Sequence, residues 1–198
     1  MDSVLKTLQR ILEMSFSNRR VERVKTPTVL QMENTECAAA SLSMILQYHG
    51  KYVPLAQLRK ICGVSRDGSD AANLVQAANS LGLKAKGFKK GVDALRQLKP
   101  PAILFWEFNH FLVFEGFIGE NVALNDPALG PRIVTEEEFD TSYTGITITF
   151  EPDKDFVKGG SAPSVWPIVF KRSFSESRGT LFVIVCGLFL ILPQLIMP

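Results

Sequence analysis

Residues 34–50 read NTECAAASLSMILQYHG, and this stretch predicts a helix over residues 35–48. Three large apolar side chains recur there at helical spacing and form one stripe, namely Leu42, Ile45 and Leu46. Gly50 follows the last periodic residue and is suited to end the helix, since glycine adopts the left-handed conformation without strain. We therefore expect a helix with one apolar face.

Cys37 lies near the start of this helix. Asn34 or Thr35 can cap the helix, which places the cysteine in the first turn. Free backbone N–H groups and the positive end of the helix dipole lie there, and both favour a thiolate over a thiol. The three alanines that follow, residues 38–40, are expected to leave a small, smooth surface that an extended peptide backbone can approach. The sequence thus predicts a reactive cysteine.

The rest of the central region predicts helices first and strands second. Two further helices are expected over residues 54–62 and 70–81. Strand patterns follow over residues 84–88, 102–106, 110–117, 122–124, 132–134 and 146–150. This order favours an α+β fold with a helical lobe and a mostly antiparallel sheet lobe over a doubly wound fold.

Composition narrows the class of protein. The chain has 198 residues, of which 46% are hydrophobic and 21% charged, so wholesale disorder, collagen-like sequence and a coiled coil are disfavoured. The formal net charge of +2 gives no basic field that would indicate a nucleic-acid partner. Three widely spaced cysteines argue against a disulfide framework, and two histidines leave little room for a metal cluster.

The N-terminal residues 1–25 predict an amphipathic helix. Apolar residues recur at helical spacing, namely Leu5, Leu8 and Leu12, while charged residues interrupt the unbroken apolar run that a secretory signal needs. The apolar face is expected to rest on another surface of the protein or on lipid.

The C-terminal residues 179–198 carry no charge, and twenty such residues match a bilayer core of roughly 30 Å at about 1.5 Å per residue. Three basic residues precede the run against one acid, so residues 1–178 are expected on the cytoplasmic side. We interpret the run as a first transmembrane helix of a longer exporter, with a tail anchor as the alternative. Residues 151–178, rich in Pro and Gly, predict a linker after a domain at 26–150.

A thiolate nucleophile needs an imidazole within hydrogen-bond reach. His49 is excluded because twelve helical residues place it roughly 18 Å from Cys37 along the axis. Cys62 ends the second helix as a small buried hydrophobe, and Cys186 lies in the apolar run. Elimination pairs Cys37 with His110.

Asp126 is expected to orient His110. A three-residue hairpin loop centred on Gly119 would place Asp126 opposite Leu112, diagonal to His110, with roughly 7–8 Å between Cβ atoms. Gln31 precedes Cys37 by six residues, so its amide can share a developing oxyanion with the cysteine N–H. The four residues together predict nucleophilic acyl-transfer chemistry.

These residues carry a family resemblance. The run over residues 28–39 (TVLQMENTECAA), the later SRDG and LGL motifs, and then NHF at 109–111 and NDP at 125–127 resemble the bacteriocin-processing peptidase domain of peptidase-containing ABC transporters. The similarity covers about residues 24–150. The segment over residues 105–111 (FWEFNHF) most resembles the branch that serves lanthipeptides and nitrile-hydratase-like leader peptides.

The resemblance implies a papain-like cysteine endopeptidase that removes the leader of a ribosomally made precursor after a double-glycine motif. It implies Cys37 as nucleophile, His110 as acid and base, Asp126 as its partner and Gln31 as oxyanion donor. Where the family commonly has Gly after the cysteine, this chain has Ala38, and its methyl group is expected at the floor of the cleft.

The resemblance also implies the surroundings of the domain. The expected partner is a precursor peptide with an amphipathic leader helix, and no cofactor is expected for the peptidase domain itself. The resemblance implies ATP for the transporter portion. This chain itself contains no phosphate-binding loop, so no ATP-binding residues are predicted in it. The full protein is expected as a multi-pass protein of the bacterial cell membrane, dimeric through its transmembrane region, with the peptidase domain in the cytoplasm.

Three alternatives remain open. A peptidase-like domain could dock substrate for export without cleaving it, although such domains typically lack the nucleophile. Another papain-like acyl-transfer enzyme, of transglutaminase or amidase type, would use the same residues on small amides. Gly159-Gly160-Ser161 has the form of the cleaved motif itself, but glycine pairs beside Pro are ordinary in linkers, which disfavours self-cleavage.

Overall fold

The computed structural model describes residues 23–66, 68–162, 165–175 and 177–196. The chain divides into two compact units, Met1–Ser161 and Ala162–Pro198. Most of the helix predicted over residues 1–25 lies outside the described residues. The described residues 23–31 have no regular secondary structure and lead to the first helical turn.

The first unit contains a six-stranded sheet in the order β1-β6-β2-β3-β4-β5, in which all neighbours are antiparallel. The strands are β1 Leu83–Lys89, β2 Ala102–Trp106, β3 His110–Ile118, β4 Asn121–Asp126, β5 Gly130–Val134 and β6 Tyr143–Pro152. All six predicted strands are confirmed, and so is the α+β fold class, although two short helices, α5 Val92–Leu95 and α6 Glu136–Ser142, lie between strands.

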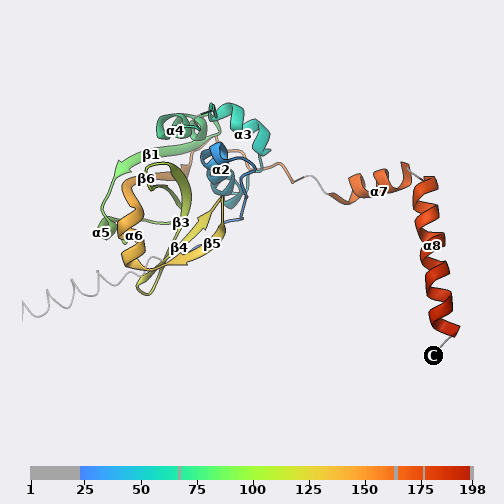
Figure 1. Cartoon of the computed structure of the whole chain (residues 1–198). Helices are drawn as coiled ribbons and strands as arrows, with labels where there is room; N and C mark the ends of the chain where they lie inside the picture. The colour runs from blue at the N-terminus through green and yellow to red at the C-terminus, as the bar shows by residue number, and fades with distance from the viewer. Residues whose placement is uncertain (1–22, 67, 163–164, 176, 197–198) are drawn as a thin grey trace, which may run out of the picture. The chain divides into compact units, whose positions relative to one another are not determined.

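Helices cover both faces of this sheet, and Figure 1 shows α2 and α6 on either side of the strands. The helices of the first unit are the 3-10 turn η1 Asn34–Glu36, α2 Cys37–Tyr48, α3 Leu55–Ile61, α4 Ala71–Ser80, α5 Val92–Leu95 and α6 Glu136–Ser142. The three predicted helices are confirmed to within two residues at each end. The short α5 has no counterpart in the sequence prediction, since one turn carries too little periodicity to detect.

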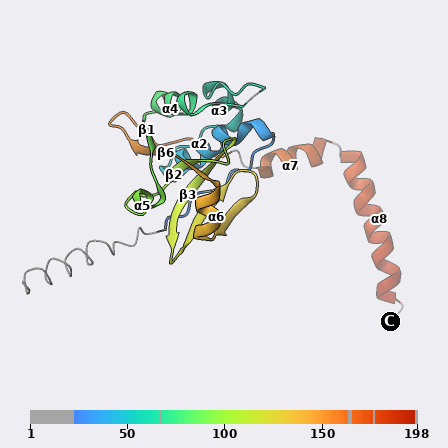
Figure 2. The same ribbon diagram turned by 60° about the vertical axis from the view of Figure 1, so that its left-hand side comes forward.

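Two apolar clusters lie against the two faces of the sheet. Alternate residues of β3 serve each cluster, because successive strand residues point to opposite faces: Phe111 and Val113 pack with the helices α2 to α4, and Leu112 and Phe114 pack with Phe139 of α6. Figure 2 shows the helices and the sheet from a second direction. The strand that begins at His110 is therefore buried on both faces.

The β3–β4 hairpin differs from the prediction in its turn but agrees in its register. The loop has two residues, Gly119 and Glu120, because Ile118 pairs with Asn121, so the predicted three-residue loop is wrong. A β-bulge between Phe114 and Gly116 adds one residue to β3 and so restores the predicted pairing beyond it. Val113 therefore pairs with Asn125, and the next position places Asp126 opposite Leu112, as predicted.

The Gly159-Gly160 pair lies against residues 50–52 of the first unit. The N–H of Tyr52 donates to the carbonyl of Gly159 at 2.8 Å. Gly160 has φ of 77°, and a Cβ there would meet the carbonyl oxygen of Tyr52 at 2.4 Å, so only glycine fits. The two glycines thus have a structural role where the chain leaves the sheet.

The second unit contains α7 Val165–Ser175, which lies within the predicted linker, and α8 Ser177–Ile196. The sequence predicts a membrane span over residues 179–198. Among the residues that the structure describes, however, no helix combines the length and the apolar character that crossing a membrane requires.

Candidate active site

Cys37 is the first residue of α2, as predicted, and only 6% of its surface is exposed. The helix runs through the centre of the domain, with every residue from Cys37 to Leu46 buried. The expectation that Ala38, Ala39 and Ala40 form an open surface is wrong, because all three are fully buried. The methyl group of Ala38 therefore packs in the interior and does not line an open cleft floor.

The start of α2 is closed by Glu36 and not by Asn34 or Thr35. Glu36 stands at the N-cap of α2, and its carboxylate accepts hydrogen bonds from the N–H groups of Met32 at 2.8 Å and Glu33 at 3.2 Å. The predicted cap is wrong because the turn η1 takes up residues 34–36 and moves the helix start to Cys37. The carboxylate of Glu36 belongs to a capping box of η1, and among the described residues no side-chain hydrogen bond caps α2 itself.

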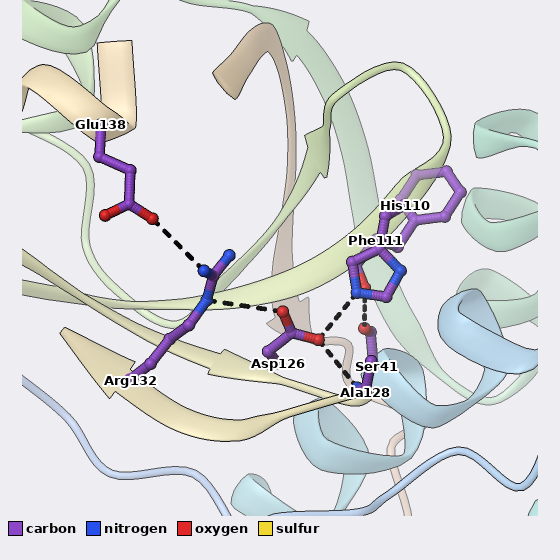
Figure 3. A network of polar contacts seen from close by, with 7 residues as sticks. All are labelled: Ser41, His110, Phe111, Asp126, Ala128, Arg132 and Glu138. Carbon is purple, nitrogen blue, oxygen red and sulfur yellow. Dashed lines mark hydrogen bonds and ion pairs between the residues drawn. The ribbon is translucent and has the colours of Figure 1, made fainter. Parts of the chain in front are cut away.

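His110 begins β3, and its ring is held by a carboxylate. Its Nε2 lies 2.8 Å from Oδ1 of Asp126, as Figure 3 shows. Because an ionised carboxylate only accepts hydrogen bonds, Nε2 carries a proton and donates it to Asp126. Cys37 lies near enough to the same imidazole to help raise its pKa, so the structure brings Cys37 and Asp126 to one histidine.

The environment of His110 favours its charged form. Burial lowers the pKa of this imidazole, but the hydrogen bonds with Asp126 and Cys37 and the negative charges of both outweigh burial and raise the pKa from 6.5 to about 9. An imidazolium beside a thiolate is the ion pair that nucleophilic cysteine chemistry uses.

The carboxylate of Asp126 is almost fully buried, and its two oxygens serve different partners. Oδ1 accepts from Nε2 of His110 and from the N–H of Ala128, both at 2.8 Å, while Oδ2 lies 3.5 Å from Nε of Arg132 (Figure 3). Burial raises the pKa of Asp126, but these donors and the positive charges of His110 and Arg132 hold it below its ordinary value. Asp126 is therefore the fixed negative charge behind the imidazole.

Arg132 on β5 is a charged neighbour of the site that the sequence analysis missed. Its guanidinium also lies 3.4 Å from Glu138 of α6 and 5.3 Å from the ring centroid of Trp106. A hairpin argument could have found it, since β5 pairs Gly130 with Asp126 and places Arg132 two positions on, on the same face. The cation counterbalances the buried carboxylate.

Gln31 lies on the segment that precedes η1. Its backbone N–H donates to the carbonyl of Pro127, directly after Asp126, at 2.8 Å. Its side-chain Oε1 is buried and has no hydrogen-bond partner. A buried acceptor of this kind is costly unless a donor reaches it, so Oε1 would gain from an N–H group that a ligand brings.

A further contact ties the helix of Cys37 to the strand of His110. The hydroxyl of Ser41, one turn after Cys37, donates to the carbonyl of Phe111, next to His110, at 3.1 Å (Figure 3). The bond is buried, so water does not compete for it. It holds the first turns of α2 in register with the start of β3.

The groups that the sequence excluded lie elsewhere. His49 is the C-terminal cap of α2, at the opposite end of the helix from Cys37. Cys62 is fully buried, and burial raises the pKa of its thiol to about 11, which keeps it protonated. Within the described ranges, no group of three or more His, Cys, Asp or Glu side chains could hold a metal ion.

Comparisons with known proteins give a consistent result. The sequence model of the Peptidase C39 family matches residues 25–155. The colicin V secretion/processing ATP-binding protein CvaB of Escherichia coli is 34% identical over 132 residues, which are 67% of this chain and 19% of that protein. The chain therefore spans about a fifth of the length of this curated relative.

Solved structures match the same region. A double-glycine motif protease from an AMS/PCAT transporter, crystallised in complex with the leader peptide, is 48% identical with a TM-score of 0.65 over 68% of this chain and 96% of that one. The peptidase domain of Streptococcus ComA shares the fold at 23% identity and a TM-score of 0.62, over 65% of this chain and 100% of that one.

Proposed function

The chain belongs to the Peptidase C39 family, and on this premise we propose that it is a cysteine endopeptidase that cuts a precursor peptide after the double-glycine motif at the end of its leader. The observation that carries the proposal is the imidazole of His110, which is hydrogen-bonded to Asp126 and whose pKa is raised by both Asp126 and Cys37. The 48% identical double-glycine protease supports the choice of substrate.

The proposed reaction begins with the thiolate of Cys37, which attacks the carbonyl carbon of the second glycine. The carbonyl oxygen takes the negative charge and accepts hydrogen bonds from the side-chain amide of Gln31 and the N–H of Cys37. His110 gives its proton to the leaving amine as the C–N bond breaks, and a thioester remains. His110 then removes a proton from water, which attacks the thioester and releases the leader with a free carboxylate.

Two variants of the chain test this assignment. The probe is a synthetic precursor whose leader carries leucines at helical spacing, ends in Gly-Gly and is followed by a short core segment. Cys37→Ala should abolish cleavage, whereas Cys186→Ala, which removes an exposed thiol, should leave it unchanged. Continued cleavage by Cys37→Ala at the wild-type rate would end the proposal.

The leader helix of the precursor is proposed to bind a groove between α4 and the strands β1 and β6. The groove has a volume of about 670 Å³, and its lining is largely apolar, with Ala71, Val75, Gly87, Phe88, Ile146 and Ile148 among the lining residues. An amphipathic helix can place its apolar face in such a groove. Support comes from the related protease, which was crystallised with a leader peptide.

Phe88→Glu tests the groove, because this side chain is 41% exposed and a charge there opposes an apolar ligand. We expect a rise in KM of about tenfold for the long precursor, with kcat unchanged. Ile118→Glu is the matched control, since Ile118 is 37% exposed on another strand. An equal KM for both variants would contradict the proposal that the leader helix binds in this groove.

The wider proposal concerns the full-length protein. We propose an ATP-driven exporter of the bacterial cell membrane, multi-pass and dimeric through its transmembrane region, with this domain in the cytoplasm. The secretion and ATP-binding roles in the name of CvaB, and the fact that the matched residues are only 19% of that protein, support this context. Full-length protein in lipid vesicles should accumulate the core peptide only with ATP, and accumulation without ATP would contradict coupling.

The alternative proposal is a domain that docks substrate without cutting it, and another is a papain-like enzyme for small amides. The bond between His110 and Asp126, and the raised pKa of His110 beside Cys37, favour cleavage over docking. Alkylation of Cys37 by iodoacetamide near neutral pH distinguishes cleavage from docking, since a docking domain needs no reactive thiol. Cleavage of the precursor but not of a simple amide distinguishes the proposed peptidase from an enzyme that acts on small amides.

A further inference from the structure

Glu36 is a buried carboxylate to which the proposed mechanism gives no part. It directly precedes Cys37, and only 1% of its surface is exposed. One oxygen, Oε2, accepts the N–H groups of Met32 at 2.8 Å and Glu33 at 3.2 Å. The other, Oε1, lies 2.9 Å from the guanidinium of Arg59. These contacts of the Glu36 charge therefore join the residue before the cysteine to the segment before the helix and to α3.

The same contacts fix the backbone on both sides of Gln31. The peptide group before Gln31 is held through its N–H, which donates to the carbonyl of Pro127 at 2.8 Å. The peptide group after Gln31 is held through the N–H of Met32, which donates to Glu36. Because both flanking peptide planes are tied, the Cα of Gln31 is placed between the loop after Asp126 and the residue before Cys37.

We infer that Glu36 is a positioning residue for the oxyanion site, whose carboxylate holds the Gln31 segment at a fixed distance from Cys37. The inference rests on the proposed function, in which the amide of Gln31 stabilises the oxyanion. A donor fixed in advance stabilises the developing charge without reorganisation at the moment of reaction. A carboxylate suits this task because hydrogen bonds to a charged acceptor are stronger than those to a neutral one.

Arg59 balances the charge of Glu36 from the outside. Its side chain is 40% exposed, and it also contacts Glu33, whose carboxylate is exposed, at 3.4 Å. Glu33→Gln therefore removes an ion pair with the same arginine but leaves both N–H bonds to Glu36 in place. It is the matched control for substitutions of Glu36.

The first experiment compares two reactions of Cys37. Glu36→Ala should lower kcat for precursor cleavage by about 10-fold to 100-fold, up to the cost of losing one oxyanion donor. The rate of alkylation of Cys37 by iodoacetamide should stay within about threefold, because that reaction forms no oxyanion. Glu36→Gln keeps one oxygen acceptor for both N–H groups and should restore most of kcat, and Glu33→Gln should cleave like the wild type. An equal loss in both reactions would overturn the inference.

The second experiment is a double-mutant cycle with Gln31→Ala. If Glu36 acts through Gln31, Glu36→Ala should add less than about a twofold loss of kcat in the Gln31→Ala background, because coupled residues are not additive. A full additive loss would overturn the role of Glu36 while leaving Gln31 in the proposed function. A wild-type kcat for Gln31→Ala alone would instead overturn the oxyanion assignment. Glu36→Asp, which withdraws the carboxylate by one methylene, serves the same cycle if Glu36→Ala does not fold.

Discussion

Replacing Asp126 by Asn would separate the charge of this side chain from its geometry. The asparagine oxygen can keep both donors of Oδ1, the Nε2–H of His110 and the N–H of Ala128, since two bonds at 2.8 Å outweigh one contact with Arg132 at 3.5 Å. The orientation of the imidazole is then retained, and only the negative charge is lost. The activity of this variant therefore measures how much of the cleavage depends on the raised pKa of His110.

The magnitude follows from the pKa of His110, which is about 9 in the intact site and 6.5 without perturbation. Because this pKa is raised, the imidazolium is populated below it and lost as the pH rises through it. At pH 7.5, about 97% of the wild-type imidazole is charged, against about 9% for a group that titrates at about 6.5. At pH 6 the two fractions are about 100% and about 76%. Asp126→Asn should therefore lower kcat/KM by about 10-fold at pH 7.5 and by less than about twofold at pH 6.

The assay is the pH profile of precursor cleavage between pH 5 and pH 10, with thermal unfolding as the control for stability. In the wild type, kcat/KM should fall on the alkaline side near pH 9, and in Asp126→Asn this fall should move toward neutral pH. A loss of the same size at every pH would mean that Asp126 acts by orientation alone, and the electrostatic reasoning would then be refuted.

Three further outcomes can be measured on folding and proteolysis. Phe108→Gly should raise the free energy of unfolding by about 1 kcal/mol in urea titrations, because Phe108 is 77% exposed and held at φ of 59°, a conformation that strains a side-chain-bearing residue. Glu115→Ala should lower that free energy by about 2–4 kcal/mol, since the N–H and hydroxyl of Thr26, which donate to its buried carboxylate at 2.7 and 2.8 Å, would be left without an acceptor. Gly160→Ala should expose residues 156–162 to limited proteolysis, because its Cβ would collide with the carbonyl of Tyr52.

The parts of the site that the sequence predicted depend on periodicity. Cys37 was placed by the helical pattern after it, and the pair His110 and Asp126 by the two-residue period of strands. The register came out right although the turn did not, because the bulge between Phe114 and Gly116 supplies the residue that the shorter loop lacks. A bulge leaves no periodic mark in a strand that is apolar on both faces, so sequence alone could not locate it.

The parts that the sequence missed depend on contacts between distant segments. Glu36 is the N-cap of α2 because the turn η1 takes up residues 34–36, and its carboxylate meets the N–H groups of Met32 and Glu33, a contact that requires the chain to turn back before the helix. The burial of Ala38 depends on how many elements surround α2, which one helix pattern does not reveal. Arg132 belongs to the site only because β5 lies beside β4.

The segment that carries Gln31 is held by the β3–β4 hairpin, and truncation can test this. Two residues at the start of this segment contact the hairpin: the N–H of Val24 donates to the carbonyl of Glu115 at 2.8 Å, and Thr26 donates to the side chain of Glu115. Deleting residues 1–22 removes none of these contacts, so kcat should stay within about twofold. Deleting residues 1–26 removes them and leaves Gln31 tied only through Pro127 and Glu36.

The longer truncation should therefore lower kcat by about 10-fold or more, since a misplaced donor stabilises the oxyanion poorly. Alkylation of Cys37 by iodoacetamide serves as the internal control, because it reports the thiolate without the oxyanion site. Urea titration shows whether the truncated domain remains folded at the assay temperature. Equal cleavage by both truncations would mean that the contacts of Gln31 with Pro127 and of Met32 with Glu36 are enough to position Gln31. The contacts of Val24 and Thr26 with Glu115 would then contribute to stability alone.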